Sequence, residues 1–215
     1  PGRGGGIATC SAGPWGRQME STKLSGGMDM GKHIVVVTGS PRTGKNTDRA
    51  ADAFVQGAQQ AGHTVYKFSL AQHRVGGCIH CMQCGKQGYC VQKDGMEEVY
   101  PQIEKADLIL FATPIYFWHI TAQMKAFIDR LYALYTMGRF PKNETGKEMG
   151  LLLVAGDSDP SVAQEPLSFF ENVFGKRLGW QNKGTLLITG TSRAGFDLEQ
   201  EGFLQKAFDL GASIQ

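Results

Sequence analysis

The stretch HIVVVTGSPRTGKNT, residues 33–47, combines a buried-strand pattern, a glycine-rich turn and the start of a helix. β-Branched and other apolar residues dominate its first six positions, as in a parallel strand covered on both faces. A helical pattern over residues 47–61 follows the turn and ends at Gly62. This order predicts a phosphate site, because free N–H groups and the helix dipole attract an anion to a helix N-terminus.

The same alternation of strand and helix continues along the chain. Further strands are expected over residues 64–70, 107–113, 151–155 and 184–189. Further helices are expected over residues 96–106, 120–135, 162–178 and 198–210. The sequence therefore predicts an α/β fold with a doubly wound parallel sheet. Ligands of such sheets bind beyond the carboxyl ends of the strands, so the loops 39–47, 113–119 and 155–160 are expected to form the site.

The composition suits one globular domain, with 215 residues, 41% hydrophobic residues and a formal net charge of +2. This charge does not indicate nucleic acid or an acidic membrane as a partner. The longest apolar run, residues 108–118, is shorter than the roughly 20 residues that cross a bilayer. With no apolar signal segment at the start, we expect a cytoplasmic protein. Residues 1–29 are expected to be a disordered tail or an expression remnant, and residues 30–215 one domain with a cysteine-rich loop, 77–92.

The first loop has three interpretations, which differ in the ligand. A nucleotide-binding P-loop needs a hydroxyl where Asn46 stands. A dinucleotide fingerprint needs more closely spaced glycines. A mononucleotide phosphate is held instead by hydroxyl, amide and main-chain groups together with a cation. The loop offers such groups from Ser40, Arg42, Thr43, Asn46 and Thr47.

The segment GSPR at residues 39–42, followed by Asn46 and Thr47, resembles the phosphate loop of the NADPH-dependent FMN reductase and multimeric flavodoxin family. The resemblance covers nearly all of residues 33–215 and includes TPIYFW at 113–118 and KAFIDR at 125–130. It implies a flavodoxin-like, five-stranded parallel sheet with strand order 2-1-3-4-5. It also implies one noncovalently bound FMN and assembly as a homodimer or homotetramer.

The resemblance assigns two further loops to the flavin ring. From the third strand it implies Pro114, Ile115, Tyr116, Phe117 and Trp118. Core packing is the alternative for these aromatics, but three in a row cannot all face one core, so we expect at least one to contact the flavin. After the fourth strand it implies Gly156 and Asp157, of which Asp157 is equally typical of a turn or helix cap. Lys125 and Asp129 are expected to form a surface ion pair.

Four of the five cysteines form the motif C-x2-C-x2-C-x5-C, made of Cys78, Cys81, Cys84 and Cys90. The first three have the spacing of a ferredoxin-type run, which predicts that all four ligate one [4Fe–4S] cluster. The spacing also resembles that of the iron–sulfur flavoproteins, a branch of the same family. Two alternatives stay open: a zinc site, although its thiolates usually come in two separated pairs, and a thiol or disulfide redox site. For His80 in this loop and Cys10 in the tail we expect no ligand role.

The resemblance thus implies an FMN-dependent oxidoreductase. It would move electrons from NAD(P)H or ferredoxin through FMN, and through the [4Fe–4S] cluster where present, to a quinone, an aromatic molecule or a protein such as a ferredoxin. No catalytic acid or base is expected, because the cofactor carries the chemistry. The alternatives are a cluster-free NAD(P)H:FMN or quinone reductase, a flavodoxin-like electron carrier without a dedicated substrate, and a P-loop nucleotide-binding protein. The loop 137–148 is expected to influence the choice of acceptor.

Overall fold

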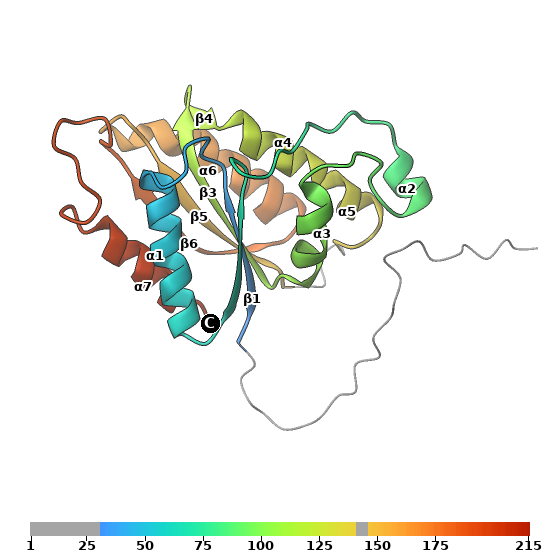
Figure 1. The fold of residues 1–215 in the computed structure, drawn as a ribbon, viewed down its shortest axis with the longest axis horizontal. Coiled ribbons are helices and arrows are strands. Elements are labelled where there is room, and N and C mark those ends of the chain that lie inside the picture. Colours follow the sequence, from blue (N-terminus) through green and yellow to red (C-terminus); the bar gives the residue numbers. More distant parts are fainter. Residues whose placement is uncertain (1–30, 141–145) are drawn as a thin grey trace, which may run out of the picture.

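The computed structural model describes residues 31–140 and 146–215. A parallel sheet forms the centre, and helices cover both of its faces (Figure 1). The strands are β1 (His33–Thr38), β2 (Thr64–Ser69), β3 (Leu108–Tyr116), β4 (His119–Ile120), β5 (Glu148–Val154) and β6 (Gln181–Ile188). They lie in the parallel order β2-β1-β3-β5-β6, and β4 pairs antiparallel with the end of β3. Apart from β4, this is the expected order 2-1-3-4-5, so the predicted fold class is confirmed.

Two layers of helices enclose the sheet. One face carries α1 (Asn46–Gln60) and α7 (Phe203–Ala212). The other carries α3 (Met96–Lys105), α4 (Ala122–Arg130), α5 (Tyr132–Thr136), α6 (Gln164–Phe170) and the π-helical η2 (Glu171–Arg177). Successive side chains of a strand point to opposite faces. In β1, Ile34 and Val36 therefore pack in the layer of α1 and α7. Val35 and Val37 pack in the opposite layer.

Three predicted helices differ from the observed ones. The helix expected over 120–135 is split at Leu131, whose N–H bonds to the Ile128 carbonyl in a turn tighter than an α-helix. The helix expected over 162–178 begins as the 3₁₀ turn η1 (Pro160–Ala163) and ends as η2. The helix expected over 198–210 begins only at Phe203, because Gly202 before it has a φ of 71° in the left-handed region.

Three predicted strand boundaries also shift. β5 begins at Glu148 rather than at residue 151, because Lys32 and Lys183 form ion pairs with the buried Glu148 carboxylate and offset the cost of burying it. β6 begins at Gln181 rather than at residue 184, with exposed polar residues on the sheet edge. β3 continues to Tyr116, so residues 113–116 form a strand and not the expected loop.

Some predictions fall outside the described residues. They are the disordered tail over residues 1–29, the role of Cys10, and residues 141–145 of the loop 137–148. Within residues 31–140 and 146–215, no helix is both long enough and apolar enough to cross a membrane.

Candidate functional site

The first predicted loop connects the carboxyl end of β1 with the N-terminus of α1 (Figure 1). Lys45 is the N-cap residue of α1, and no side chain caps the helix there. The main-chain N–H groups of the first turn are thus available to an anion, and the helix dipole favours it. The hydroxyl-bearing residues Ser40 and Thr47 are buried at the base of the loop, whereas Arg42 and Thr43 are exposed.

Local hydrogen bonds hold this loop in shape. The Ser40 hydroxyl accepts a hydrogen bond of 3.1 Å from the Arg42 N–H. The Gly44 N–H donates to the Asp48 carboxylate at 2.7 Å. Burial raises the pKa of Asp48, but hydrogen bonds from Lys67 and Gly44 lower it by more. Asp48 is therefore ionised near the helix N-terminus, and it shares the cation Lys67, at 2.6 Å, with Asp52.

Hydrogen bonds join the first loop to the end of β3. The Gly39 N–H donates to the Ala112 carbonyl at 2.8 Å. The Thr121 hydroxyl donates to the Gly39 carbonyl at 2.8 Å and also accepts from the Met124 N–H at the start of α4. A Cβ atom on Gly39 would lie 3.0 Å from the Met124 side chain, so this close approach favours glycine. The predicted phosphate loop and the aromatic segment are thus held in one rigid arrangement.

The aromatic segment forms a hairpin between β3 and β4, with Phe117 and Trp118 at its tip. Their φ angles of 48° and 60° match the two central residues of a type I′ turn. Phe117 is 92% exposed and Trp118 60% exposed, and Tyr116 is also exposed. Core packing of these three aromatics is therefore excluded. Two bulky residues in the left-handed region cost stability, which is typical of functional loops. Contact with a flavin stays a prediction.

The two other predicted residues of this segment lie deeper. Pro114 is buried in β3 and pairs with Val154 of β5. Ile115 is half-buried and pairs with Ile120 of β4. Their side chains thus pack at the base of the hairpin. A ligand at this edge of the sheet would therefore meet their main-chain atoms rather than their side chains.

The third predicted loop follows β5 and packs against residues 190–192. A Cβ atom on Gly156 would lie 2.5 Å from the Ser192 hydroxyl oxygen, so a larger residue here requires that hydroxyl to rotate away. The Asp157 carboxylate accepts from the Asp159 N–H at 3.0 Å, which is the turn role given above as the alternative to flavin binding. Neither observation tests contact with a flavin. On α4, Lys125 and Asp129 form the expected ion pair, at 2.6 Å.

The cysteine loop lies beside α4 and α5 and contains one short helix, α2 (Gln83–Gln87). Its thiols are free; Cys78 and Cys81 are exposed, and Cys84 and Cys90 are half-buried. All four line one small cavity, together with Arg130 and Tyr132. The four cysteines that the spacing predicted thus lie around one cavity, but their sulfurs are not grouped as ligands of a metal ion, and His80 on the same cavity is exposed.

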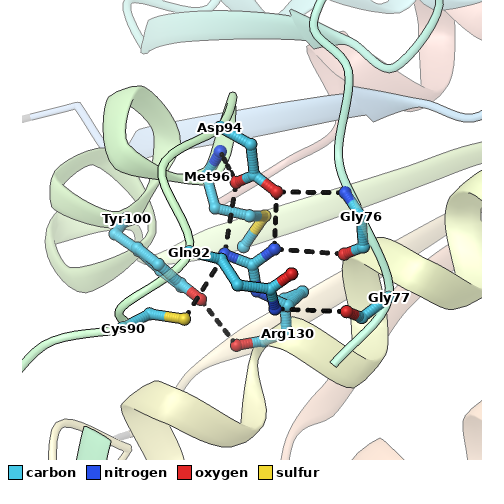
Figure 2. Close-up of polar contacts among 8 residues, drawn as sticks. All are labelled: Gly76, Gly77, Cys90, Gln92, Asp94, Met96, Tyr100 and Arg130. Atoms are coloured by element: carbon cyan, nitrogen blue, oxygen red, sulfur yellow. Dashed lines mark hydrogen bonds and ion pairs between the residues drawn. The ribbon is translucent and has the colours of Figure 1, made fainter. Parts of the chain in front are cut away.

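Arg130, at the end of α4, connects this loop to the core (Figure 2). Its guanidinium donates to both oxygens of Asp94, at 2.6 and 3.2 Å, and to the Gly76 carbonyl at 3.1 Å. Nη2 also donates to the Cys90 sulfur at 3.4 Å. Burial lowers the pKa of Arg130, but Asp94 and the neighbouring Tyr100 and Cys90 raise it by more, so the side chain is permanently charged.

The donor set fits a thiolate-ligated cluster in its chemistry. Four free thiols face one cavity, and a buried cation with an unpartnered Nε atom lies beside them. Within the described part of the chain, however, no three His, Cys, Asp or Glu side chains are grouped as ligands of a metal ion. The predicted ligand roles of the four cysteines, and the zinc and thiol alternatives, therefore stay predictions.

A larger cavity, of about 690 Å³, opens between α4–α5 and α6–η2. Its wall includes five Phe and Tyr residues: Tyr132, Tyr135, Phe140, Phe169 and Phe174. Cys78 and His80 line it as well as the small cavity. No residue predicted to bind FMN contributes to it, so the predicted flavin site and this cavity are separate features of the surface.

The fold and the site together define an α/β protein whose first loop leads into an uncapped helix N-terminus at the carboxyl edge of its sheet. The profile of the NADPH-dependent FMN reductase family matches residues 33–169. The chain belongs to this family, which confirms the resemblance seen in the sequence.

Relatives named iron–sulfur flavoproteins are similar over part of the chain. One from Archaeoglobus fulgidus is 36% identical over 97 residues, which are 45% of this chain and 44% of the relative. One from Methanosarcina thermophila is 31% identical over 118 residues, or 55% of this chain and 62% of the relative. The chain thus spans less than two thirds of the length of either relative. In fold, the NAD(P)H:quinone oxidoreductase from Methanothermobacter marburgensis is similar, with a TM-score of 0.66 and 22% identity over 86% of this chain and 99% of that one.

Sequence reasoning missed three residues that shape the site. Thr121 joins two of the loops, Ser192 packs against the third, and Arg130 contacts the cysteine loop. For Thr121, its position before α4 is a helix-capping signal. For Arg130, the signal is that a charged residue closely follows the apolar residues Phe127 and Ile128, which are buried in the same short helix. Nothing local in the sequence indicates Ser192.

Proposed function

We propose that the chain is an FMN-dependent oxidoreductase. It takes electrons from NAD(P)H or a ferredoxin-like protein and delivers them to a quinone, an aromatic molecule or a protein acceptor, as a cytoplasmic homodimer or homotetramer. The observation that carries the proposal is the uncapped N-terminus of α1 beneath a loop with the buried hydroxyl-bearing residues Ser40 and Thr47, in a chain of the FMN reductase family.

The phosphate of FMN would lie at the first turn of α1. Main-chain N–H groups there and the side chains of Ser40, Thr43, Asn46 and Thr47 would bind it, with Arg42 as a nearby cation. Asn46, and not Ser or Thr, directly follows Lys45, so the loop lacks the usual magnesium-binding hydroxyl of a P-loop protein.

The flavin ring would lie along the carboxyl edge, between the hairpin tip and the loop at Gly156. When bound, FMN supplies both two-electron and one-electron transfer. The chain's part is to bind and orient the ring. The exposed faces of Tyr116, Phe117 and Trp118 offer a flat apolar surface for it, and the strained turn keeps these rings out of the core.

The cysteine loop would hold a [4Fe–4S] cluster through Cys78, Cys81, Cys84 and Cys90. Four free thiols on one cavity and a buried cation support this assignment, as do the names of the relatives. Such a cluster supplies one-electron transfer. The second candidate, a cluster-free NAD(P)H:FMN or quinone reductase, is favoured by the absence of grouped metal ligands among the described residues.

The test is anaerobic purification, followed by a visible spectrum and assays of extracted FMN, iron and acid-labile sulfide. Thr47→Val removes a hydroxyl from the proposed phosphate site without changing the volume of the side chain. Thr64→Val is the matched control, because Thr64 is exposed at the start of β2. In Thr47→Val we expect FMN to bind about ten- to hundredfold more weakly, because one hydrogen bond to a charged group is lost. In Thr64→Val we expect no change in FMN affinity.

Each result separates the candidates. Flavin together with about four irons per chain supports the full proposal. Flavin without iron, with rapid NAD(P)H oxidation, supports the cluster-free reductase. Flavin with slow NAD(P)H oxidation and fast exchange with ferredoxin supports the electron carrier. A colourless chain that cannot be reconstituted with FMN contradicts all three.

A further inference from the structure

Arg130 is the largest fully buried side chain among the described residues, with a side-chain exposure of 1%. A buried guanidinium is costly unless its charge and its N–H groups find partners. Asp94 supplies the opposite charge, and the Gly76 carbonyl accepts one further hydrogen bond. These partners offset the cost of burying Arg130.

The charge of Asp94 is shared among several donors. Besides Arg130, the N–H groups of Gly76 and Met96 donate to this carboxylate, at 3.0 and 3.1 Å. These amides occupy part of the carboxylate's hydrogen-bonding capacity, so the guanidinium has N–H groups left for partners other than Asp94. Its Nη2 points to the Cys90 sulfur at 3.4 Å, and its Nε has no partner within the described part of the chain (Figure 2).

The direction of Nη2 is set by the other contacts. Asp94 and Gly76 fix the plane of the guanidinium, and the hydroxyl of Tyr100 donates to the Arg130 carbonyl at 2.9 Å, which holds the end of α4. A rigid cation thus faces the small cavity that the four thiols line. Thiolates carry negative charge, and hydrogen bonds to ligand sulfurs influence the reduction potential of an iron–sulfur cluster.

We propose that Arg130 is a positioning residue for the cluster site, which holds the Cys90 sulfur in place and donates a hydrogen bond to it that raises the cluster's reduction potential. This inference rests on the cluster assigned under the proposed function. The inference goes beyond the proposed function, because it gives a role to a residue outside the cysteine motif.

The experiment compares anaerobically purified full-length wild type, Arg130→Gln and Arg130→Lys. Arg139→Gln is the matched control. Arg139 also donates to a carbonyl of the cysteine loop, at Gly88, and pairs with Glu104, but among its described contacts there is no sulfur. The readouts are iron and sulfide per chain and the reduction potential of the cluster, measured by spectroelectrochemical titration. FMN content reports folding, because the proposed flavin site lies elsewhere.

We expect Arg130→Gln to lose most of its iron, with the potential of any remaining cluster shifted to more negative values. Arg130→Lys keeps a charge but not the planar fork, so its iron content and potential should fall between those of Arg130→Gln and wild type. Arg139→Gln should match wild type. If Arg130 only stabilised the fold, its substitution would lower the yield of folded protein but would not change the reduction potential of the cluster, and that result would contradict the inference.

A second variant covers the case in which Arg130→Gln does not fold. The pair Arg130→Gln and Asp94→Asn removes both charges, so no buried charge is left unpaired. This double variant should bind FMN. It should also show the loss of iron, or the more negative reduction potential, that we expect of Arg130→Gln. Iron content and potential equal to wild type in the folded Arg130 variants would overturn the inference and leave the cluster intact. A wild type without iron would instead overturn the proposed cluster, and the inference with it.

Discussion

Arg130 and Asp94 lie 36 residues apart in the sequence, and two hydrogen bonds, of 2.6 and 3.2 Å, join the two ends of the guanidinium to the two carboxylate oxygens. Bidentate pairs of this kind have well-defined geometry as well as strength. This one attaches the segment just after the cysteine loop to the end of α4 (Figure 2). The other end of α4, at Thr121, is hydrogen-bonded to the predicted phosphate loop. One helix thus positions both candidate cofactor sites.

The first prediction concerns stability. Asp94→Asn removes the carboxylate and leaves the buried charge of Arg130 without an ionic partner, so the free energy of unfolding should fall by about 3 kcal/mol. Chemical denaturation at pH 7 measures it. Glu97→Gln is the control, because Glu97 forms an exposed ion pair with Lys93 and should change stability by less than about 1 kcal/mol. Equal effects of the two substitutions would show that burial of Arg130 does not depend on Asp94.

The second prediction concerns pH. Burial raises the pKa of Asp94, but the hydrogen bonds from Arg130, Gly76 and Met96 lower it by more. A carboxyl whose pKa is lower in the folded state stabilises the fold above its unfolded pKa of about 3.9, and this contribution is lost as pH falls through the folded pKa. The stability difference between wild type and Asp94→Asn should therefore stay constant from about pH 7 to 5 and shrink below about pH 4. A difference that grew on acidification would contradict the assigned ionisation.

Much of the fold follows from local patterns. The β-branched run of residues 33–38 and the alternation of strands and helices predict the parallel sheet, and the two periodicities are properties of short segments. Boundaries were wrong where a distant residue decides them. Glu148 can begin β5 only because Lys32 and Lys183 neutralise it, and neither lies next to it in the sequence.

For the site too, local features were predicted and contacts between distant residues were not. Its loops follow from the positions of strand ends, and its four thiols from their spacing. The sequence around Arg130 does not indicate that Asp94 is its partner, because the two residues lie on different segments and meet only after the chain folds. The left-handed turn at Phe117 and Trp118 was also missed, since such residues rarely adopt positive φ and propensity alone argues against it.

The third prediction tests the packing at Gly156. Gly156→Ala places a methyl group 2.5 Å from the Ser192 oxygen. Because this oxygen is the rotatable end of a short side chain, we expect a loss of less than about 1 kcal/mol in the free energy of unfolding. Ser192→Ala removes that oxygen, so the double variant should recover most of the loss. A double-mutant cycle measures the coupling. No recovery would mean that the methyl group meets another obstacle, and a loss of FMN binding in the recovered double variant would indicate that Gly156 also approaches the flavin.

The last prediction separates strain from function at the hairpin tip. Asn tolerates the left-handed conformation that Phe117 adopts, and the exposed ring has little packing to lose, so Phe117→Asn should raise the free energy of unfolding of the apoprotein by about 1 kcal/mol. Phe117→Ala is the control, because alanine has no such tolerance and should leave stability nearly unchanged. If the ring contacts the flavin, both variants should bind FMN about three- to tenfold more weakly, the worth of one aromatic contact. Denaturation of the apoprotein and fluorescence titration with FMN measure the two effects separately. Unchanged FMN affinity in both variants would remove Phe117 from the flavin site, whereas a stabilised Phe117→Asn with weakened FMN binding would show that the strain is kept for the cofactor.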